Sequence, residues 1–202
     1  MRRPTPSIAI LLCVVLLTGC GARLGQTDEI NIDYPVFPEY SAEVNELIKE
    51  TAYSALDLYD EDSFDSEQRL LLDIAYEVKM KEEDFVSVAF SGQGHIPPRS
   101  RLDHFFYTLN LDIKTGEEVR LADKASIDDA FANALHQAAR ETLNPESYEL
   151  FRHDYIDCPY NDDCSFLQEL ASADAYFTPN TIGVILPIKA TADRYYVIEI
   201  PR

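Results

Sequence analysis

The sequence contains no motif that marks a catalytic centre. Its 202 residues include no Gly-x-Ser-x-Gly, no glycine loop for phosphate, no His-Glu-x-x-His and no Cys/His nucleophile pair. The four histidines are scattered, and no third histidine or carboxylate falls at ligand spacing around His95 and His104. With 36 acidic residues, no single pair of carboxylates stands out as that of a glycosidase. We therefore expect a binding protein and not an enzyme, with no cofactor and no metal.

The sequence also lacks an apolar run long enough to cross a bilayer. Ile8–Leu17 is apolar over about ten residues, whereas a transmembrane helix needs about 20. This run follows Arg2 and Arg3, which is typical of a secretory signal peptide. Leu17-Thr18-Gly19-Cys20 then resembles the bacterial lipobox, whose cysteine becomes the acylated first residue of the mature protein. The alternative is an ordinary secretory signal with an incidental cysteine.

Lipidation at Cys20 would hold the chain on a membrane surface, because several acyl chains bury enough CH₂ groups in lipid for stable anchoring. We predict a signal peptide over residues 1–19, a lipidated tether over 20–29 and a single domain over 30–202. In a Gram-negative host, the expected location is the periplasmic side of the outer membrane.

Cysteine is scarce, and the few cysteines fit an exported chain. Of the four, Cys13 lies in the predicted signal and Cys20 carries the predicted lipid, which leaves Cys158 and Cys164. Since exported proteins meet an oxidising environment, we expect these two to form a local disulfide. A redox or zinc pair is excluded because five residues intervene and no second pair exists. The loop from Asp157 to Cys164 is rich in oxygen ligands but lacks the EF-hand spacing, so we expect a polar loop.

Basic residues are few, and the chain is strongly acidic. Seventeen Lys and Arg stand against 36 Asp and Glu, for a formal charge of -19. Such a charge repels nucleic acid and anionic lipid head groups and attracts basic proteins, although solubility alone is the simpler explanation. One acidic cluster follows the first predicted helix and is either a solvated loop or a landing place for a cationic partner: Asp57, Asp60, Glu61, Asp62 and Asp65.

Periodic patterns predict two helices and several strands. A helix is expected after an N-cap at Ser41, with an apolar stripe from Val44 to Tyr59, and a second after Ser126. Alternating or apolar segments predict strands over 30–37, 72–80, 85–90, 105–113, 175–178, 182–188 and 195–200, and a glycine- and proline-rich loop is expected over 91–100. These elements indicate an α+β domain with two main helices packed on one face of a largely antiparallel sheet.

The segments "DYPVF", "NLDIKTGEEVRLAD" and "YFTPNTIGVILPI…YYVIEIP" occur in a familiar order. They resemble the exported domain found at the C-terminus of the lysozyme-sensing anti-sigma factor RsiV and of PdaC-type peptidoglycan deacetylases, and in many stand-alone lipoproteins. The best motif is a hairpin "N-x-D-x-x-T-G", here Asn110, Asp112, Thr115 and Gly116. A second is a Gly-Gly-Ala-His loop, here Gly92, Gly94 and His95, with Gln93 at the second glycine.

The resemblance implies a binding domain of the cell envelope, since the catalytic residues of the deacetylases lie in a separate domain. The chain departs from the family at Ile188–Asp193, where members carry "Y-E-I-A-P-Y". We therefore expect a lipid-anchored domain that binds lysozyme or another cationic protein active on the cell wall, and no nucleic acid. The alternatives are a structural or assembly lipoprotein that binds another envelope component, and a glycan-acting envelope enzyme.

Overall fold

The computed structural model describes residues 28–59, 69–98, 101–157, 166–189 and 194–202. In these ranges the chain forms a four-stranded sheet, in the order β1-β2-β3-β4, and a three-stranded sheet, in the order β5-β6-β7. The strands are β1 (Glu29–Ile32), β2 (Leu71–Lys81), β3 (Phe85–His95), β4 (Leu102–Asp112), β5 (Asp174–Phe177), β6 (Thr181–Pro187) and β7 (Tyr195–Pro201). Only β1 and β2 pair in parallel; the other described pairs are antiparallel.

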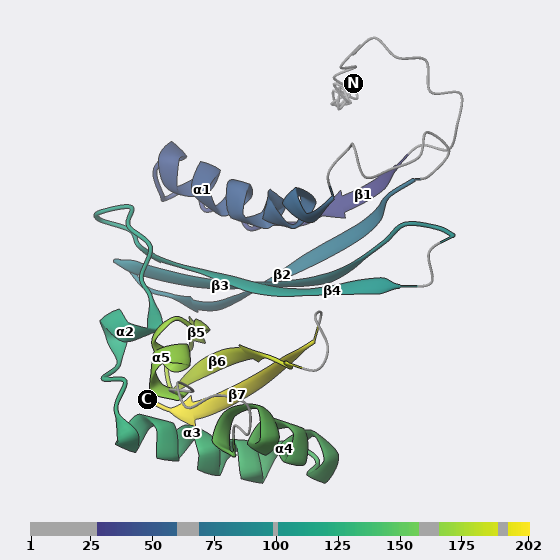
Figure 1. The fold of residues 1–202 in the computed structure, drawn as a ribbon. Helices are drawn as coiled ribbons and strands as arrows, with labels where there is room; N and C mark the ends of the chain where they lie inside the picture. The colour runs from purple at the N-terminus through teal and green to yellow at the C-terminus, as the bar shows by residue number, and fades with distance from the viewer. Residues whose placement is uncertain (1–27, 60–68, 99–100, 158–165, 190–193) are drawn as a thin grey trace, which may run out of the picture.

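The two sheets lie between two layers of helices, as Figure 1 shows. α1 (Ala42–Tyr53) covers the outer face of the first sheet, and α3 (Asp129–Thr142) and α4 (Pro145–Phe151) cover the second. The predicted α+β class is confirmed. The predicted packing of both helices on one face of one sheet is wrong, because each helix layer shares an apolar core with a different sheet.

The first helix layer forms as its local sequence predicts. Ser41 caps α1 by accepting a hydrogen bond from the Val44 N–H at 3.3 Å. Val44, Ile48 and Ala52 are buried against the first sheet, which confirms the predicted stripe. A 3₁₀ helix, Ser54–Leu58, continues the chain beyond α1.

The second helix layer contains more elements than the sequence patterns predict. The N-cap of α3 is Asp128, which accepts from the Phe131 N–H at 3.0 Å, and not Ser126 as expected. Three short helices and a π-helical segment were not predicted: α2 (Leu121–Lys124), α4, α5 (Phe166–Ala171) and Arg152–Ile156. They have fewer than eight residues each. The three helices each bury one large apolar side chain, and the π-helical segment buries Asp154 and Tyr155. In the described ranges, no helix has the length and apolar character needed to cross a membrane.

Side chains of the first sheet hold the free edge of β5. Ser87 Oγ accepts a hydrogen bond from the Phe177 N–H at 2.9 Å. Thr108 Oγ1 and Asn110 Nδ2 both donate to the Ala175 carbonyl oxygen at 2.8 Å. Because β5 is an edge strand of its sheet, these bonds satisfy backbone groups that would otherwise lie unpaired between the layers.

Candidate functional site

The predicted hairpin motif forms a tight turn directly after β4. Asp112 Oδ1 accepts from the N–H groups of Lys114 and Thr115 at 2.9 and 3.1 Å. The hydrogen bond from Thr115 is the main cause of the lowered pKa of the Asp112 carboxyl. Gly116 has a φ of 72°, a conformation that glycine adopts without strain. The predicted turn is confirmed, and the roles of these residues in it are structural.

Asn110, the first residue of this motif, faces the second sheet and is buried, with 5% of its surface exposed. Its Nδ2 donates to the Ala175 carbonyl oxygen at 2.8 Å, and its own backbone carbonyl accepts from the Val119 N–H at 2.8 Å. Its Oδ1, which is also buried, has no hydrogen-bond partner in the part of the chain that the structure describes. A buried acceptor without a partner is uncommon in folded proteins.

Asn110 lines a cavity of about 330 Å³ between the hairpin and the connection from α5 to β5. The rest of the wall comes from β4, from the segment that leads into α2, and from the α5–β5 connection. Its lining residues are Thr108, Asn110, Glu118, Val119, Arg120, Leu121, Ala171, Ser172, Ala173, Asp174 and Ala175. We call this cavity the hairpin cavity.

Two carboxylates stand at the exposed rim of the hairpin cavity. Glu118 and Asp174 both have exposed surface, and neither makes an ion pair within the described ranges. Although part of Asp174 is exposed, the protein around the rest of its carboxyl removes it from water and raises its pKa. Repulsion from Glu118 raises the pKa of Asp174 further. Arg120 also lines the cavity, but it does not contribute to the raised pKa of Asp174.

A second cavity, of about 300 Å³, lies beside the same α5–β5 connection. The two cavities share Ser172, Ala173 and Asp174 as lining residues. Around the second cavity, Lys189 Nζ is already paired with Glu169 at 2.8 Å and lies 4.5 Å from the centre of the Tyr155 ring. Glu169 therefore has a cation within the chain, whereas Asp174, which lines both cavities, makes no ion pair within the described ranges.

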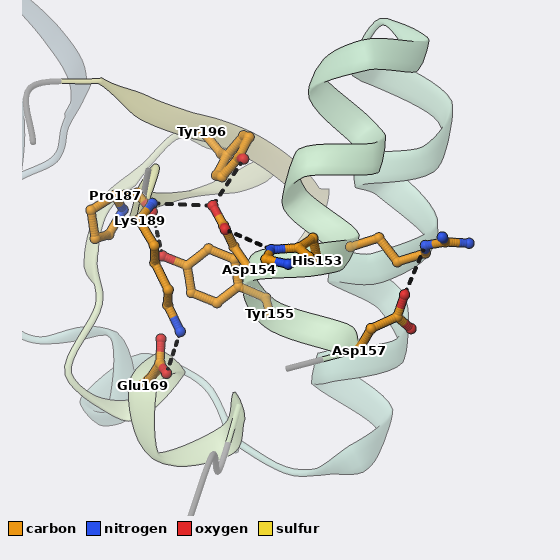
Figure 2. A network of polar contacts seen from close by, with 9 residues as sticks. His153, Asp154, Tyr155, Asp157, Glu169, Pro187, Lys189 and Tyr196 are labelled. Carbon is orange, nitrogen blue, oxygen red and sulfur yellow. Dashed lines mark hydrogen bonds and ion pairs between the residues drawn. The ribbon is translucent and has the colours of Figure 1, made fainter. Parts of the chain in front are cut away.

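Figure 2 shows how a buried carboxylate organises this neighbourhood. Asp154, with 6% of its surface exposed, accepts from the Lys189 N–H at 3.1 Å and from the Tyr196 hydroxyl at 3.2 Å. His153 Nδ1 lies 3.5 Å from the other carboxylate oxygen. Burial, and then the Asp154 charge, raise the pKa of Tyr196. Lys189, which follows β6, and Tyr196, which lies on β7, are therefore both bonded to Asp154 in the π-helical segment.

One family motif lies in a different structure from the one predicted. Gly92, Gly94 and His95 belong to β3 and not to a loop. A Cβ at Gly94 would lie 1.9 Å from Tyr59 Oη, and one at Gly92 would lie 2.0 Å from the Asp73 carbonyl oxygen. The glycines therefore allow other groups to pack closely against β3. The sequence pattern predicted a loop here because glycine is also common in turns.

Several predicted sites lie wholly or partly outside the described residues. Cys20 and the Cys158–Cys164 pair are outside, so lipidation and the disulfide stay predictions. Of the acidic cluster, only Asp57 is described, and it is exposed on the 3₁₀ helix; the others, Asp60, Glu61, Asp62 and Asp65, are outside. Among the described residues, no group of three His, Cys, Asp or Glu is arranged to hold a metal ion.

The sequence matches no protein-family model, and no curated protein matches it. Among solved structures, the chain is similar to a DUF3298 family protein from Pseudomonas aeruginosa PAO1, with 13% identity and a TM-score of 0.50 over 91% of this chain and 85% of that chain. A DUF3298 family member from Bacteroides fragilis NCTC 9343 is 12% identical, with a TM-score of 0.43 over 79% of this chain and 60% of that chain.

The Pseudomonas structure shows the fold of this chain. Proteins of the DUF3298 family have the fold of the RsiV/PdaC-like exported domain, so the resemblance seen in the sequence is confirmed at the level of the fold. The stand-alone lipoprotein form stays a prediction.

Sequence reasoning missed the acids of the hairpin cavity. Glu118 and Asp174 lie 56 positions apart in the sequence. Neither is one of the motif residues, although Glu118 lies within the segment "NLDIKTGEEVRLAD". Asn110 was identified, but only as a turn residue. The hydrogen bond from Asn110 to Ala175 spans 65 positions, and only the folded chain shows that it brings the two acids to one cavity.

Proposed function

We propose that this chain is a lipid-anchored binding domain of the cell envelope whose partner is a cationic protein active on the cell wall, with lysozyme as the first candidate. One observation carries the proposal: a chain of formal charge -19 presents, at the rim of a cavity, two carboxylates that make no ion pair with any residue the structure describes. A field of this sign draws basic proteins toward the surface and opposes nucleic acid. The fold likeness is consistent with this use but does not assign it.

Anchoring is supported by the lipobox-like segment that ends at Cys20. The test is mass spectrometry of the full chain expressed in a Gram-negative host, with Cys20→Ser as the control. We expect the chain to begin at an acylated Cys20 and to fractionate with membranes, and the variant to lose both properties. A chain that is cleaved elsewhere and carries no lipid would contradict this part of the proposal.

The partner is tested by calorimetry of the full chain in detergent micelles, titrated with a c-type lysozyme at low and moderate salt. We expect saturable one-to-one binding that weakens as salt rises, because the screening length falls to about 8 Å near 0.15 M. Following lysozyme activity in parallel distinguishes a receptor from an inhibitor. Binding that is indifferent to salt, or no binding at either salt, would contradict the proposal.

The glycan-acting enzyme is the second candidate, and one observation favours it. The Asp174 carboxyl has a raised pKa and stands near a second carboxyl, Glu118, at the same cavity. Glycosidases use such a difference between two acids for proton donation and for nucleophilic or basic assistance. Release of reducing ends from peptidoglycan by the full chain, abolished by Asp174→Asn, would establish this candidate in place of the binding domain.

The assembly lipoprotein would need an exposed apolar surface for its partner. In the described ranges eight large apolar or aromatic residues are exposed, and the most exposed are Val36 and Leu58, at 63% and 73%. Exposed apolar side chains are common on folded domains and do not by themselves mark an interface. The cationic partner therefore remains the better supported proposal.

A further inference from the structure

We propose that the outer edge of β4 from Leu102 to Thr108, called here the open edge, binds an extended basic segment of the partner protein as an additional strand. β4 is the last strand of the first sheet (Figure 1), and in the described ranges the backbone of its outer edge pairs only with the hairpin that follows it. The proposal rests on the proposed function for the cationic character of the partner. It adds where that partner binds and through which groups.

The hairpin shows which backbone groups of β4 point away from β3. The Asn110 carbonyl accepts from the Val119 N–H at 2.8 Å, and the Asp112 N–H donates to the Glu117 carbonyl at 3.0 Å. Asn110 and Asp112 therefore direct their backbone groups toward the outer edge. In an antiparallel pair, alternate residues of one strand point their N–H and C=O groups to the same side.

Three more residues of β4 follow the same alternation. β4 pairs with β3 without a register shift over its whole length, so His104, Phe106 and Thr108 also direct their backbone groups outward. In the described ranges, no other strand or turn pairs with these groups. The open edge thus offers three N–H donors and three carbonyl acceptors in a row of about 14 Å. An extended polypeptide has the alternating donors and acceptors that complement such a row.

The open edge lacks the features that usually prevent strand addition. Natural edge strands are often very short, contain proline or lysine, or carry a bulge. The open edge, residues 102–108, has none of these features. Its one acid, Asp103, already accepts from the Tyr59 hydroxyl at 3.0 Å and pairs with Arg101 at 3.1 Å. The strand is therefore regular enough over this length to pair with another.

The other edges of the two sheets are protected. β1 has only four residues, and the part of β2 that β1 does not cover contains a register shift between Val78 and Met80. β7 carries Glu199 and ends with Pro201. β5 is bonded to side chains of the first sheet. Among the described strands, β4 therefore has the longest unprotected edge.

The charge beside the open edge favours a basic occupant. Thr108 lines the hairpin cavity together with Glu118 and Asp174, which make no ion pair with any described residue, so an added strand would end beside these two acids. Arg120 also lines the cavity, and the three charges sum to one negative unit. A second copy of the chain would bring a further formal charge of -19, whereas a basic segment would be attracted. The open edge therefore fits a basic partner better than a second copy.

The side chains along the open edge favour apolar residues in the middle of the added strand. Phe106 and Tyr107 are partly exposed and point to opposite faces of the sheet. The Phe106 ring lies 6.4 Å from the Tyr176 ring, and the Tyr107 ring stacks on Phe90 at 5.2 Å. Aromatic side chains pair well with β-branched residues across strands. We expect such residues in the middle of the segment and lysine or arginine at its end.

The test is NMR of the full chain in detergent micelles, titrated with the peptide acetyl-Lys-Val-Thr-Val-Thr-Val-Lys-amide. We expect saturable shifts of the backbone amides of His104, Phe106 and Thr108, and slower exchange of these amides with solvent, because they become hydrogen-bond donors. The same peptide with glutamate at both ends should bind at least about tenfold more weakly. The basic peptide N-methylated at its five central residues should also bind at least about tenfold more weakly, because it lacks the backbone donors.

A proline on the open edge tests the same contact from the side of the chain. His104→Pro removes one outward N–H and leaves the bonds to β3 in place, because those lie on the other side of the strand. It should weaken binding of the basic peptide at least about tenfold. The matched control is Ala42→Pro, at the exposed first position of α1, where proline is well tolerated. It should leave the affinity unchanged within about twofold.

Four results would overturn the strand addition: no shift at the three amides; equal binding of the N-methylated peptide; equal binding of the acidic peptide; or equal effects of the two proline variants. Slow exchange of the three amides before any peptide is added would show that the edge is already occupied, and would overturn it as well. Lysozyme binding without a change at these amides would overturn the strand addition and leave the proposed function standing. Binding of the basic peptide as expected, without any binding of a cationic protein, would support the strand addition and overturn the proposed function.

Discussion

Ser87 gives the most direct test of how the two sheets are joined, because one of the three side-chain hydrogen bonds between the first sheet and β5 depends on a single atom, its Oγ. Its side chain is fully buried, and its Oγ accepts the Phe177 N–H at 2.9 Å. Replacing Ser87 by Ala removes that oxygen and changes the side-chain volume little. The Phe177 N–H then lies buried at the edge of β5 without a partner. An unsatisfied buried donor costs about 1–3 kcal/mol, so we expect the free energy of unfolding to fall by that amount.

The assay is equilibrium unfolding of the full chain in urea, followed by circular dichroism. The midpoint should fall while the slope with denaturant stays the same, because the surface exposed on unfolding does not change. Ser91→Ala is the matched control, since Ser91 lies on the same strand, is exposed, and its hydroxyl has no hydrogen-bond partner in the described ranges. It should change stability by less than about 0.5 kcal/mol. Equal effects of the two substitutions would refute this account of the sheet contact.

Two further predictions concern β3 and the hairpin cavity. Gly94→Ala should lower the free energy of unfolding in urea by about 1–3 kcal/mol, because a Cβ there meets Tyr59 Oη at 1.9 Å and the ring must move; an unchanged midpoint would contradict this. The raised pKa of Asp174 means that the folded state binds protons more tightly than the unfolded state, so the charged carboxylate opposes folding above its folded pKa. Asp174→Asn should therefore raise the urea midpoint slightly at neutral pH. Below the ordinary pKa of aspartate it should have no effect on the midpoint. A lower midpoint at neutral pH would contradict the conclusion that the Asp174 charge opposes folding.

Local rules were enough to predict the first helix and most strands. The Ser41 cap and the spacing of Val44, Ile48 and Ala52 depend on residues within a few turns of each other, so the sequence shows them directly. The alternation in β2 is equally local. The extension of β3 to His95 is not, because the packing at Gly92 and Gly94 involves residues far away in the sequence.

The division into two sheets could not be derived from alternation alone. Period-two patterns show which face of a strand is apolar, but they do not show which strands share a sheet. One local indication was present: residues 85–90, "FVSVAF", are apolar at all positions but Ser87, and all six residues are buried in the structure. A strand covered on both faces belongs in an inner layer, as β3 does between α1 and the second sheet.

The sequence did not reveal the hairpin cavity, for a related reason. Asn110 and Asp112 lie in one short motif, yet Asp112 bonds its own turn while Asn110 bonds a strand 65 positions away. Asparagine at a turn entrance suggests only the local role. Glu118 and Asp174 line the same cavity only because that distant contact brings their two segments together.

The central claim is that this domain binds a cationic protein through charge, and one comparison tests it most directly. The full chain in detergent micelles would be titrated, near physiological salt, with c-type lysozyme and with the same lysozyme after acetylation of its lysine amines. We predict saturable one-to-one binding of the unmodified protein and a loss of at least about tenfold in affinity after acetylation. Equal affinity for the two forms, or no binding of either, would contradict the claim.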